Sequence, residues 1–206
     1  MVADGNTIRD MLLAVADVMD AERDALCRLD GEIGDGDHGV AMSGGFGAVR
    51  AALADLDGAD PTTVFNTAAK SFLNAVGASS GPLYATAFMR AGMALKGKQD
   101  LQDADAAEMV AAMADGIAHR GKAQPGDKTM LDAWTPATEA AGAARDSTFA
   151  QILAQAADAA EKGAEATTDM EAKLGRSARL GARSIGHKDP GAASAALMLR
   201  AMAEAV

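Results

Sequence analysis

The chain has 206 residues, of which 49% are hydrophobic and 3% aromatic, and its formal net charge is −10. Because 29 acidic residues outnumber 19 basic ones and no dense basic run occurs, the composition argues against nucleic acid as a partner, and the few rings argue against stacking on bases or sugars. No apolar run approaches the ~20 residues that cross a bilayer, and the N-terminus lacks a basic region followed by an apolar stretch, so we expect a cytoplasmic chain that contacts no membrane.

Length and cysteine content set the organisation that we expect. A chain of this size can bury a sizeable core, and one domain over residues 1–206 is the default interpretation. The single cysteine, Cys27, excludes an internal disulfide framework, which agrees with a reducing compartment.

The apolar residues recur every three or four positions rather than alternating, which predicts an all-α fold of about eight helices with no convincing strand. In chain order, the apolar stripes cover residues 8–19, 46–56, 64–73, 82–96, 103–118, 129–144 and 147–168, and a last helix begins at 189. Asp60 before Pro61, and Asp189 before Pro190, are typical pairs of a helix cap and a first-turn residue. The helix that precedes the acidic turn is expected to end near Leu26.

Glycine and proline gather in four loops between these stripes. The loops cover residues 31–39, 77–82, 121–126 and 175–191. Loops on a rigid scaffold often carry binding and catalytic residues, so we expect the functional residues there.

The first of these loops lies in the segment LDGEIGDGDHGV, residues 29–40, and is unusually acidic. Its glycines match the G-x-G-x-x-G spacing of a dinucleotide-binding turn, but a helix rather than a strand precedes them, which argues against that function. A calcium loop counted from Asp30 places Ala41 where a bidentate glutamate is required. Carboxylates of Asp30, Asp35 and Asp37 in a flexible turn are instead the donors that a hard cation such as Mg²⁺ prefers. Acidic turn residues that are simply solvated remain the alternative.

The second loop offers donors for a phosphate. Residues 77–82 read GASSGP, which combines small residues, two hydroxyls and the start of a helix whose amides and dipole favour an anion. Such a segment by itself is an ordinary helix cap. Together with the acidic turn, it predicts a site for a Mg²⁺-bound polyphosphate.

Four segments in the same order resemble the nucleotide-binding L subunit (DhaL) family of dihydroxyacetone kinases. They are LDGEIGDGDHG (29–39), GASSGPLYATAF (77–88), PGDKTMLDAWTPA (125–137) and GRSARLGARSIGHKDPGA (175–192), and they are spread over nearly the whole chain. The resemblance implies an antiparallel up-and-down barrel of eight helices that holds ADP or ATP and two Mg²⁺ ions at one end. Family members often carry asparagine at the position of Ala41, so a side-chain hydrogen bond from that position is absent here.

The same resemblance implies the site residues. The metal ligands would be Asp30, Asp35 and Asp37. The phosphate contacts would be His38, Gly39, Ser79, Ser80, Gly81 and Arg176, and the adenine pocket would involve Gly121, Met130, Asp189, Pro190 and Gly191. No catalytic residue beyond these metal and phosphate ligands is expected on the chain, because positioning and charge neutralisation carry phosphoryl transfer.

The function implied is transfer of the γ-phosphoryl group to dihydroxyacetone, or a similar short ketose, bound on a separate K subunit. A phosphoryl-donor M subunit of the phosphotransferase system would recharge a retained nucleotide, and a homodimer stays open. The alternatives are a nucleotide-sensing regulatory module and a kinase subunit that exchanges ATP as a substrate. A free-standing metal phosphatase is disfavoured, because no partner acid accompanies the aspartates.

Overall fold

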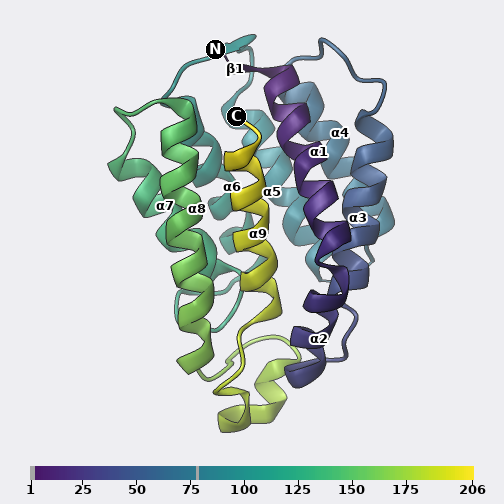
Figure 1. The fold of residues 1–206 in the computed structure, drawn as a ribbon, viewed down its shortest axis with the longest axis vertical. Coiled ribbons are helices and arrows are strands. Elements are labelled where there is room, and N and C mark those ends of the chain that lie inside the picture. The colour runs from purple at the N-terminus through teal and green to yellow at the C-terminus, as the bar shows by residue number, and fades with distance from the viewer. Residues whose placement is uncertain (1–2, 78) are drawn as a thin grey trace.

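The computed structural model describes residues 3–77 and 79–206, and this part of the chain is almost entirely helical (Figure 1). Its nine α-helices are α1 (Gly5–Ala21), α2 (Arg23–Ile33), α3 (His38–Leu53), α4 (Pro61–Ala75), α5 (Ser80–Ala94), α6 (Asp105–Gly121), α7 (Leu131–Ala143), α8 (Phe149–Ala166) and α9 (Pro190–Glu204). Two 3-10 helices, η1 (Thr167–Asp169) and η2 (Ser177–Ser184), lie between α8 and α9. The predicted all-α class is confirmed.

The helices run side by side, and the loops gather at the two ends of the bundle (Figure 1). Helix α9 packs against both α8 and α1, so the last helix lies next to the first. The turn between α2 and α3 and the segment that contains η2 share the end opposite to the C-terminus (Figure 1). The finer expectation of an eight-helix antiparallel barrel stays a prediction.

Local capping signals place several helix starts. Asp60 caps α4, where its carboxylate accepts a hydrogen bond from the backbone N–H of Thr63, and Pro61 is the first helical residue. Asp189 and Pro190 do the same for α9. Both predicted caps are confirmed. The cap carboxylate accepts a hydrogen bond from a first-turn N–H that has no partner within the helix, and proline has no N–H that could be left unpaired.

The apolar stripes of the helices meet in one continuous core. Its aromatic part joins Phe46 of α3, Phe72 of α4 and Phe88 of α5, with the rings of Phe46 and Phe72 edge to face and their centroids 5.1 Å apart. Edge-to-face pairs are preferred because the positive ring edge meets the negative ring face. These ring contacts therefore hold α3, α4 and α5 together.

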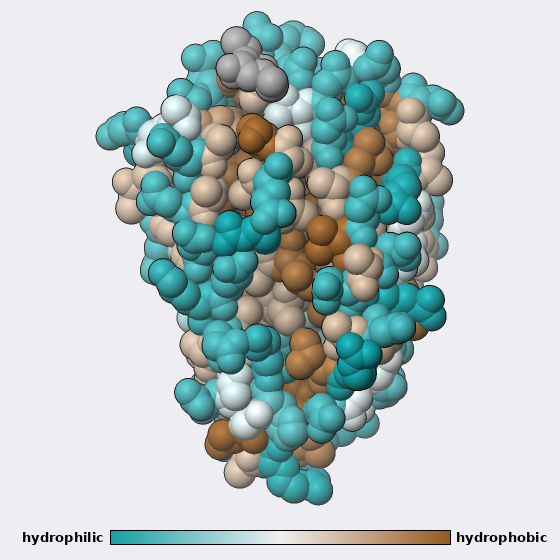
Figure 2. All heavy atoms as spheres, in the orientation of Figure 1, coloured by the Kyte–Doolittle hydropathy of each residue, from teal (hydrophilic) through white to brown (hydrophobic). Residues whose placement is uncertain are grey.

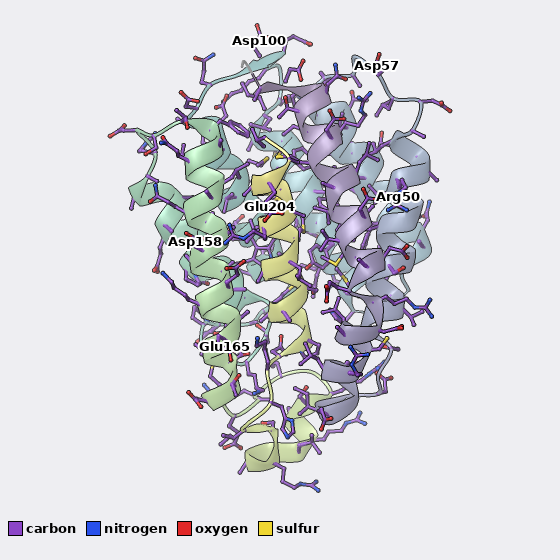
Figure 3. The ribbon with its side chains drawn as sticks, in the orientation of Figure 1. Arg50, Asp57, Asp100, Asp158, Glu165 and Glu204 are labelled. Atoms are coloured by element: carbon purple, nitrogen blue, oxygen red, sulfur yellow. The ribbon has the colours of Figure 1, made fainter. Side chains whose placement is uncertain are left out.

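Most charged side chains of the described residues lie on the outside of the bundle. Arg50 on α3, and Asp158 and Glu165 on α8, extend from the helices into solvent (Figure 3). The space-filling view of this face is mainly hydrophilic, with apolar side chains in a band along its middle (Figure 2). Among residues 3–77 and 79–206, no helix has the length and apolar character needed to cross a membrane.

Two local features differ from the sequence-based expectation. The helix expected to end near Leu26 continues as α2 to Ile33, so Asp30 lies in a helix rather than in a loop. Gly31 is tolerated there because its position is exposed and open. A two-residue antiparallel pair, β1 (Ala3–Asp4) with β2 (Asp100–Leu101), also forms where no strand was expected, and two residues are too few to give a period.

Two neighbouring glycines of α3 give a matched test of core packing. A Cβ on Gly45 would lie 2.4 Å from Cε2 of Phe72, whereas one on the exposed Gly44 would meet nothing within 4 Å. Gly45→Ala is therefore expected to lower the free energy of unfolding by about 1–3 kcal/mol through overpacking. Gly44→Ala is expected to raise it by about 0.5–1 kcal/mol, because alanine favours the helix. Urea unfolding measures both, and equal effects would contradict this packing.

Candidate functional site

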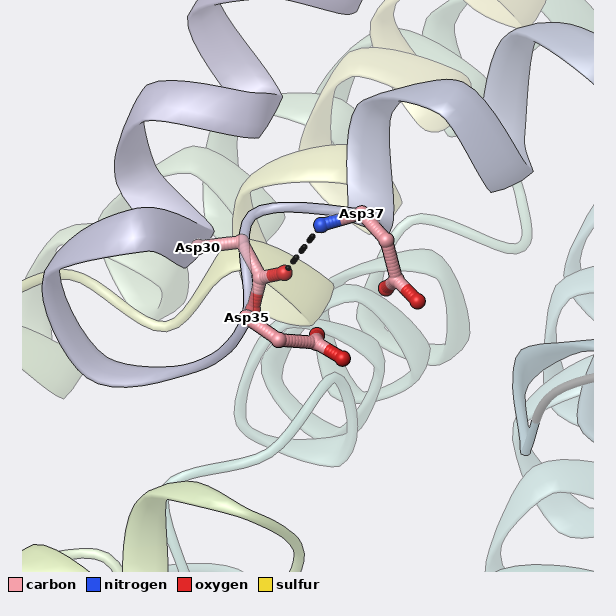
Figure 4. Close-up of side chains that lie close together, drawn as sticks. All are labelled: Asp30, Asp35 and Asp37. Carbon is pink, nitrogen blue, oxygen red and sulfur yellow. Dashed lines mark hydrogen bonds between the residues drawn. The ribbon is translucent and has the colours of Figure 1, made fainter.

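The turn between α2 and α3 is organised by the carboxylate of Asp30. This side chain projects from the last turn of α2, and its Oδ2 accepts hydrogen bonds from the backbone N–H groups of Asp37 (2.9 Å) and His38 (3.2 Å) (Figure 4). The first amides of a helix have no partner within the helix and carry partial positive charge. Asp30 thus caps α3 from the preceding helix and fixes the path of the turn.

Glycines are required at two positions of this turn. A Cβ on Gly34 would lie 2.2 Å from Oδ1 of Asp30, so any side chain there would displace the carboxylate. Gly36 has φ +77°, a left-handed conformation that side chains with a Cβ rarely adopt. The glycines that resemble a dinucleotide-binding fingerprint therefore serve to gather carboxylates.

Three carboxylates converge at this turn. One oxygen each of Asp30, Asp35 and Asp37 can be chosen so that all lie within 4.8 Å of one another (Figure 4). Asp35 and Asp37 are exposed, whereas Asp30 is buried. Hard oxygen donors gathered on a turn fit a divalent cation such as Mg²⁺, and they fit neither a soft metal nor an anion.

Arg176 supplies the cationic partner of this cluster from the opposite side. Its guanidinium forms an ion pair with Asp35, and its Nη1 lies 3.5 Å from Oδ2 of Asp37. The sequence places Arg176 on the segment between η1 and η2, far along the chain from the aspartates. The structure therefore brings together two of the four predicted loops at one point.

His38 lies at the start of α3, beside the carboxylates. Its Nε2 lies 2.9 Å from Oγ of Ser194, and the Ser194 hydroxyl is 3.0 Å from the backbone oxygen of Gly191, to which it donates. Burial lowers the pKa of His38, although Asp30 acts in the opposite direction. The imidazole is thus tied to the N-terminal part of α9.

A cavity of about 200 Å³ adjoins the carboxylates, and a second of about 350 Å³ continues from it. Both are lined by Ser79, Leu83, Thr129, Met130, Leu174 and Gly175. The second is largely apolar, with Pro82, Ile117 and Ala123 in its wall. The site is therefore a cleft that is acidic at one end and apolar at the other.

A family model described as the DAK2 domain matches residues 32–204. The chain belongs to the DAK2 domain family. The ADP-binding subunit DhaL of the PEP-dependent dihydroxyacetone kinase of Escherichia coli (strain K12) is 38% identical to it, with 95% of this chain and 94% of that subunit covered. The resemblance to the L subunit is thereby confirmed.

The chain is also similar to parts of longer kinases. The L-erythrulose 1-kinase of Mycolicibacterium smegmatis is 38% identical, with 87% of this chain and 32% of that kinase covered. The crystal structure of the dihydroxyacetone kinase of C. freundii in its native form has a TM-score of 0.75 at 26% identity, with 97% of this chain and 34% of that chain covered. This chain spans about a third of the length of either kinase.

Most of the predicted site residues of this DAK2 domain line the cleft. The first cavity is lined by Asp30, Asp35, Asp37, His38, Ser79, Ser80, Met130, Arg176, Asp189 and Gly191, and the second by Gly121 and Met130. Ala78, within the predicted 77–82 loop, lies outside the described residues. Gathering these side chains in one cleft is compatible with the predicted roles, which stay predictions.

Three predicted residues line neither cavity. A Cβ on Gly39 would lie 1.9 Å from the backbone oxygen of Arg23, and one on Gly81 would lie 2.0 Å from that of Val76. These glycines allow close approach of backbone at the starts of α3 and α5. Pro190 is buried as the first residue of α9. Contacts of these three with a phosphate or adenine group stay predictions.

Lys128 is the most informative residue of the cleft that the sequence analysis missed. It lines the first cavity but is only 1% exposed. Lysine is almost never fully buried, so no sequence rule selects it. The segment PGDKTMLDAWTPA pointed to this region without indicating the position.

Asp189 combines a structural role with an unusual environment. It is buried, and its Oδ2 accepts a hydrogen bond from the backbone N–H of Ala192 (2.7 Å). Burial raises the pKa of Asp189 to about 7, although the hydrogen bond from Ala192 and the charge of Lys128 act to lower it. This carboxyl group therefore takes up its proton near neutral pH.

The raised pKa of Asp189 predicts a pH-dependent stability. The folded state holds this proton more tightly than the unfolded chain, so the stabilisation is complete below the ordinary value of 3.8 and is lost as the pH rises through about 7. Asp189→Asn keeps a capping oxygen but does not titrate. Relative to the parent chain, it should gain up to about 1.4 kcal/mol per pH unit between about pH 5 and 7. Urea unfolding with a chelator present measures this difference, and a difference that does not change with pH would contradict the prediction.

Proposed function

We propose that this chain is the nucleotide-binding subunit of a kinase that phosphorylates dihydroxyacetone or a similar short ketose. The observation that supports this most directly is the three carboxylates of Asp30, Asp35 and Asp37, which share one cavity with the first turn of α5. The carboxylates favour binding of a metal ion, and the start of the helix favours binding of an anion. The E. coli relative, an ADP-binding subunit of a PEP-dependent dihydroxyacetone kinase, agrees with this proposal.

In this proposal, Asp30, Asp35 and Asp37 hold two Mg²⁺ ions. These carboxylates would hold the ions, which when bound would supply neutralisation of the phosphate charge. Asp30 has a second duty, because its carboxylate already accepts two backbone hydrogen bonds from the start of α3. The carboxylates of Asp35 and Asp37 do not cap α3 and are exposed, so they can change orientation more easily to contact a metal ion.

The phosphate groups would lie against the start of α5. Ser79 is the cap residue of α5, yet its side chain makes no capping hydrogen bond, so the first amides of the helix are left for another acceptor. Amides and dipole at a helix start favour an anion. We therefore assign the phosphates to Ser79, Ser80 and the guanidinium of Arg176, which lines the same cavity.

The adenine ring would occupy the apolar cavity. Met130 lies between the two cavities, while Gly121 and Leu83 face the second. A Cβ on Gly121 would lie 3.1 Å from Cδ2 of Leu83, so glycine leaves room at this wall. A flat apolar ring stacked between methionine and leucine side chains would remove apolar surface from water.

The ketose would bind on a separate K subunit rather than on this chain. Phosphoryl transfer depends on positioning and on charge stabilisation, so the chain contributes metal and phosphate ligands and no nucleophile. The relatives are named as kinases of different ketoses, among them L-erythrulose. We therefore propose a short ketose as the substrate class, with dihydroxyacetone as one member. We further propose a cytoplasmic location and a single domain over residues 1–206.

The phosphoryl donor would be a phosphoprotein of the phosphotransferase system, the M subunit, with the nucleotide retained as a cofactor. The PEP-dependent relative of nearly equal length supports this choice. Retention requires a cleft that closes over the nucleotide, and the exposed side chain of Leu174 beside Arg176 lies at its mouth. Closing such loops is a common way to retain a bound ligand.

The decisive experiment mixes this chain with a K subunit, ketose and either ATP or a phosphoenolpyruvate-driven phosphotransferase system. We expect the second donor to sustain many turnovers and free ATP to support few. Full turnover with ATP alone would identify an ATP-exchanging kinase subunit. Binding of Mg-ADP without transfer from either donor would favour a regulatory module that senses nucleotide.

A further inference from the structure

Lys128 has an environment that phosphate or metal binding does not explain. Its side chain is buried, and Nζ donates hydrogen bonds to three backbone oxygens, those of Thr167 (2.6 Å), Met170 (3.1 Å) and His187 (2.5 Å). An ammonium group has three protons, so all three are used. The charge points into the protein rather than into the cleft.

Burial of this ammonium is costly, so its retention needs a reason. Within residues 3–77 and 79–206, no carboxylate lies within ion-pair distance of Nζ. Burial lowers the pKa of Lys128, and only the more distant charges of Asp189 and Asp169 oppose this effect. A buried charge is normally paired, and here backbone oxygens alone replace its hydration.

The three backbone oxygens lie at the two ends of the segment that carries Arg176. We call residues 170–187 the arginine loop, because it carries Arg176. Thr167 lies just before it, Met170 is its first residue and His187 its last, so one ammonium joins both ends. The backbone N–H of Gly186 also donates to the oxygen of Thr168 (2.7 Å), which closes the same base.

The tip of the arginine loop is the part that reaches the cleft. Leu174, Gly175, Arg176 and Ser177 line the first cavity, and Arg176 pairs there with Asp35 and Asp37. The tip is largely exposed, with few buried side chains to hold it. Between base and tip, the N–H of Lys173 donates to the backbone oxygen of Asp127 (3.1 Å) and the N–H of Ala172 to the buried hydroxyl of Ser184 (2.9 Å), so the position of the tip depends on the base together with these contacts.

The backbone around Lys128 is arranged to present the ammonium to this base. Lys128 has φ +60°, a left-handed conformation that costs free energy for a residue with a Cβ. The carboxylate of Asp132 holds the turn, because it accepts hydrogen bonds from the N–H groups of Gly126 (2.5 Å) and Thr129 (2.8 Å). The unfavourable backbone conformation of Lys128 is thus stabilised by the hydrogen bonds of Asp132, which fixes the direction of the lysine side chain.

We propose that Lys128 is a positioning residue whose ammonium fastens both ends of the arginine loop and thereby holds Arg176 against the carboxylates of the cleft. The role of the loop at the nucleotide rests on the proposed function, whereas its fastening by Lys128 does not. In this proposal Lys128 acts through Arg176, because the hydrogen bonds of its Nζ go to the backbone oxygens of the loop base.

Limited trypsin digestion without nucleotide tests the fastening alone. Lys128→Met keeps the length and apolar stem but leaves three oxygens without a donor, so cleavage after Arg176, Arg179 and Arg183 should rise at least about 10-fold. The control is Lys122→Met, because Lys122 also has a positive φ (56°) but is exposed. Unchanged cleavage in Lys128→Met, or equal change in the control, would overturn the proposal.

A double-mutant cycle with Arg176→Gln tests the route to the nucleotide. If Lys128 acts through Arg176, Lys128→Met should speed Mg-ADP dissociation about 10-fold or more in the parent chain and have little further effect beside Arg176→Gln. Strictly additive effects would overturn the positioning role. Absence of Mg-ADP binding in the parent chain would instead defeat the proposed function and leave the trypsin result standing.

A second variant covers failure of Lys128→Met to fold. Lys128→Arg keeps a buried cation with a different reach. Folding is followed by circular dichroism, and hydrogen exchange then reports each segment separately. The proposal expects faster exchange confined to residues 167–187. Exchange that is uniformly faster in α1 and α4, or unchanged in the arginine loop, would overturn it.

Discussion

Asp35→Asn is expected to weaken Mg-ADP binding by at least about 100-fold. Loss of a residue that only supports a metal ligand already lowers metal affinity by about 10–100-fold, and here a proposed ligand itself is lost. The substitution removes one charged donor at nearly constant volume. Asp35 is chosen over Asp30 because the carboxylate of Asp30 also holds the backbone N–H groups of Asp37 and His38, so its loss would disturb α3. The exposed Asp35 makes no such hydrogen bond, and the helices should remain intact.

Titration calorimetry with Mg-ADP measures this loss, and circular dichroism checks the fold. Glu32→Gln is the matched control, because it removes one negative charge from the same segment outside the carboxylate cluster. Ligand at 100-fold above its dissociation constant stabilises the parent chain by about 2.7 kcal/mol. The thermal shift should therefore appear with Mg²⁺ and ADP, and vanish with chelator or in Asp35→Asn. Unchanged affinity in Asp35→Asn would remove the metal assignment.

Arg176→Gln is expected to slow phosphoryl transfer by at least about 100-fold, the size of effect seen when one charge-stabilising donor is removed from an active site. The guanidinium lines the cavity beside the carboxylates, where charge on a transferring phosphoryl group would develop. Stability should change far less, within about 0.5 kcal/mol, because the ion pair of Arg176 with Asp35 is half exposed and screened by water.

The transfer assay with K subunit and ketose measures the rate under single-turnover conditions, and urea unfolding measures stability. Arg179→Gln is the control, because Arg179 is an exposed arginine of the same 3-10 segment that lines neither cavity. Near-normal transfer by Arg176→Gln would show that Arg176 serves only as a partner of the aspartates. A loss of stability as large as that of a core substitution would argue for a structural role.

Several features of the fold could be predicted because they depend on neighbours in the chain. Apolar residues three and four positions apart indicate helices through the geometry of a helical turn alone. Asp60 with Pro61 places the start of α4 in the same way, since cap and donor are three residues apart. The end of α2 was placed too early, because glycine at position 31 suggested a loop where packing and an open surface tolerate a helix.

The carboxylate cluster belongs to the same local class. Asp30, Asp35 and Asp37 are separated by so few residues that a turn with glycines has to bring them close together, and the predicted cluster appears in the structure. The sequence could not indicate that Asp30 would be buried as a cap of α3. That role depends on where α2 ends relative to α3, which tertiary packing decides.

The sequence by itself determined the helical class, the helix caps and the gathering of three carboxylates, because each follows from interactions within about ten residues. Only the tertiary structure decided which distant groups complete the cleft. Arg176 meets Asp37 across 139 positions of the chain, and Lys128 reaches the oxygen of His187 across 59. Neither contact has a local period or motif, because a buried ammonium and an exposed guanidinium acquire their partners only when packing of the helices brings separate loops to one end.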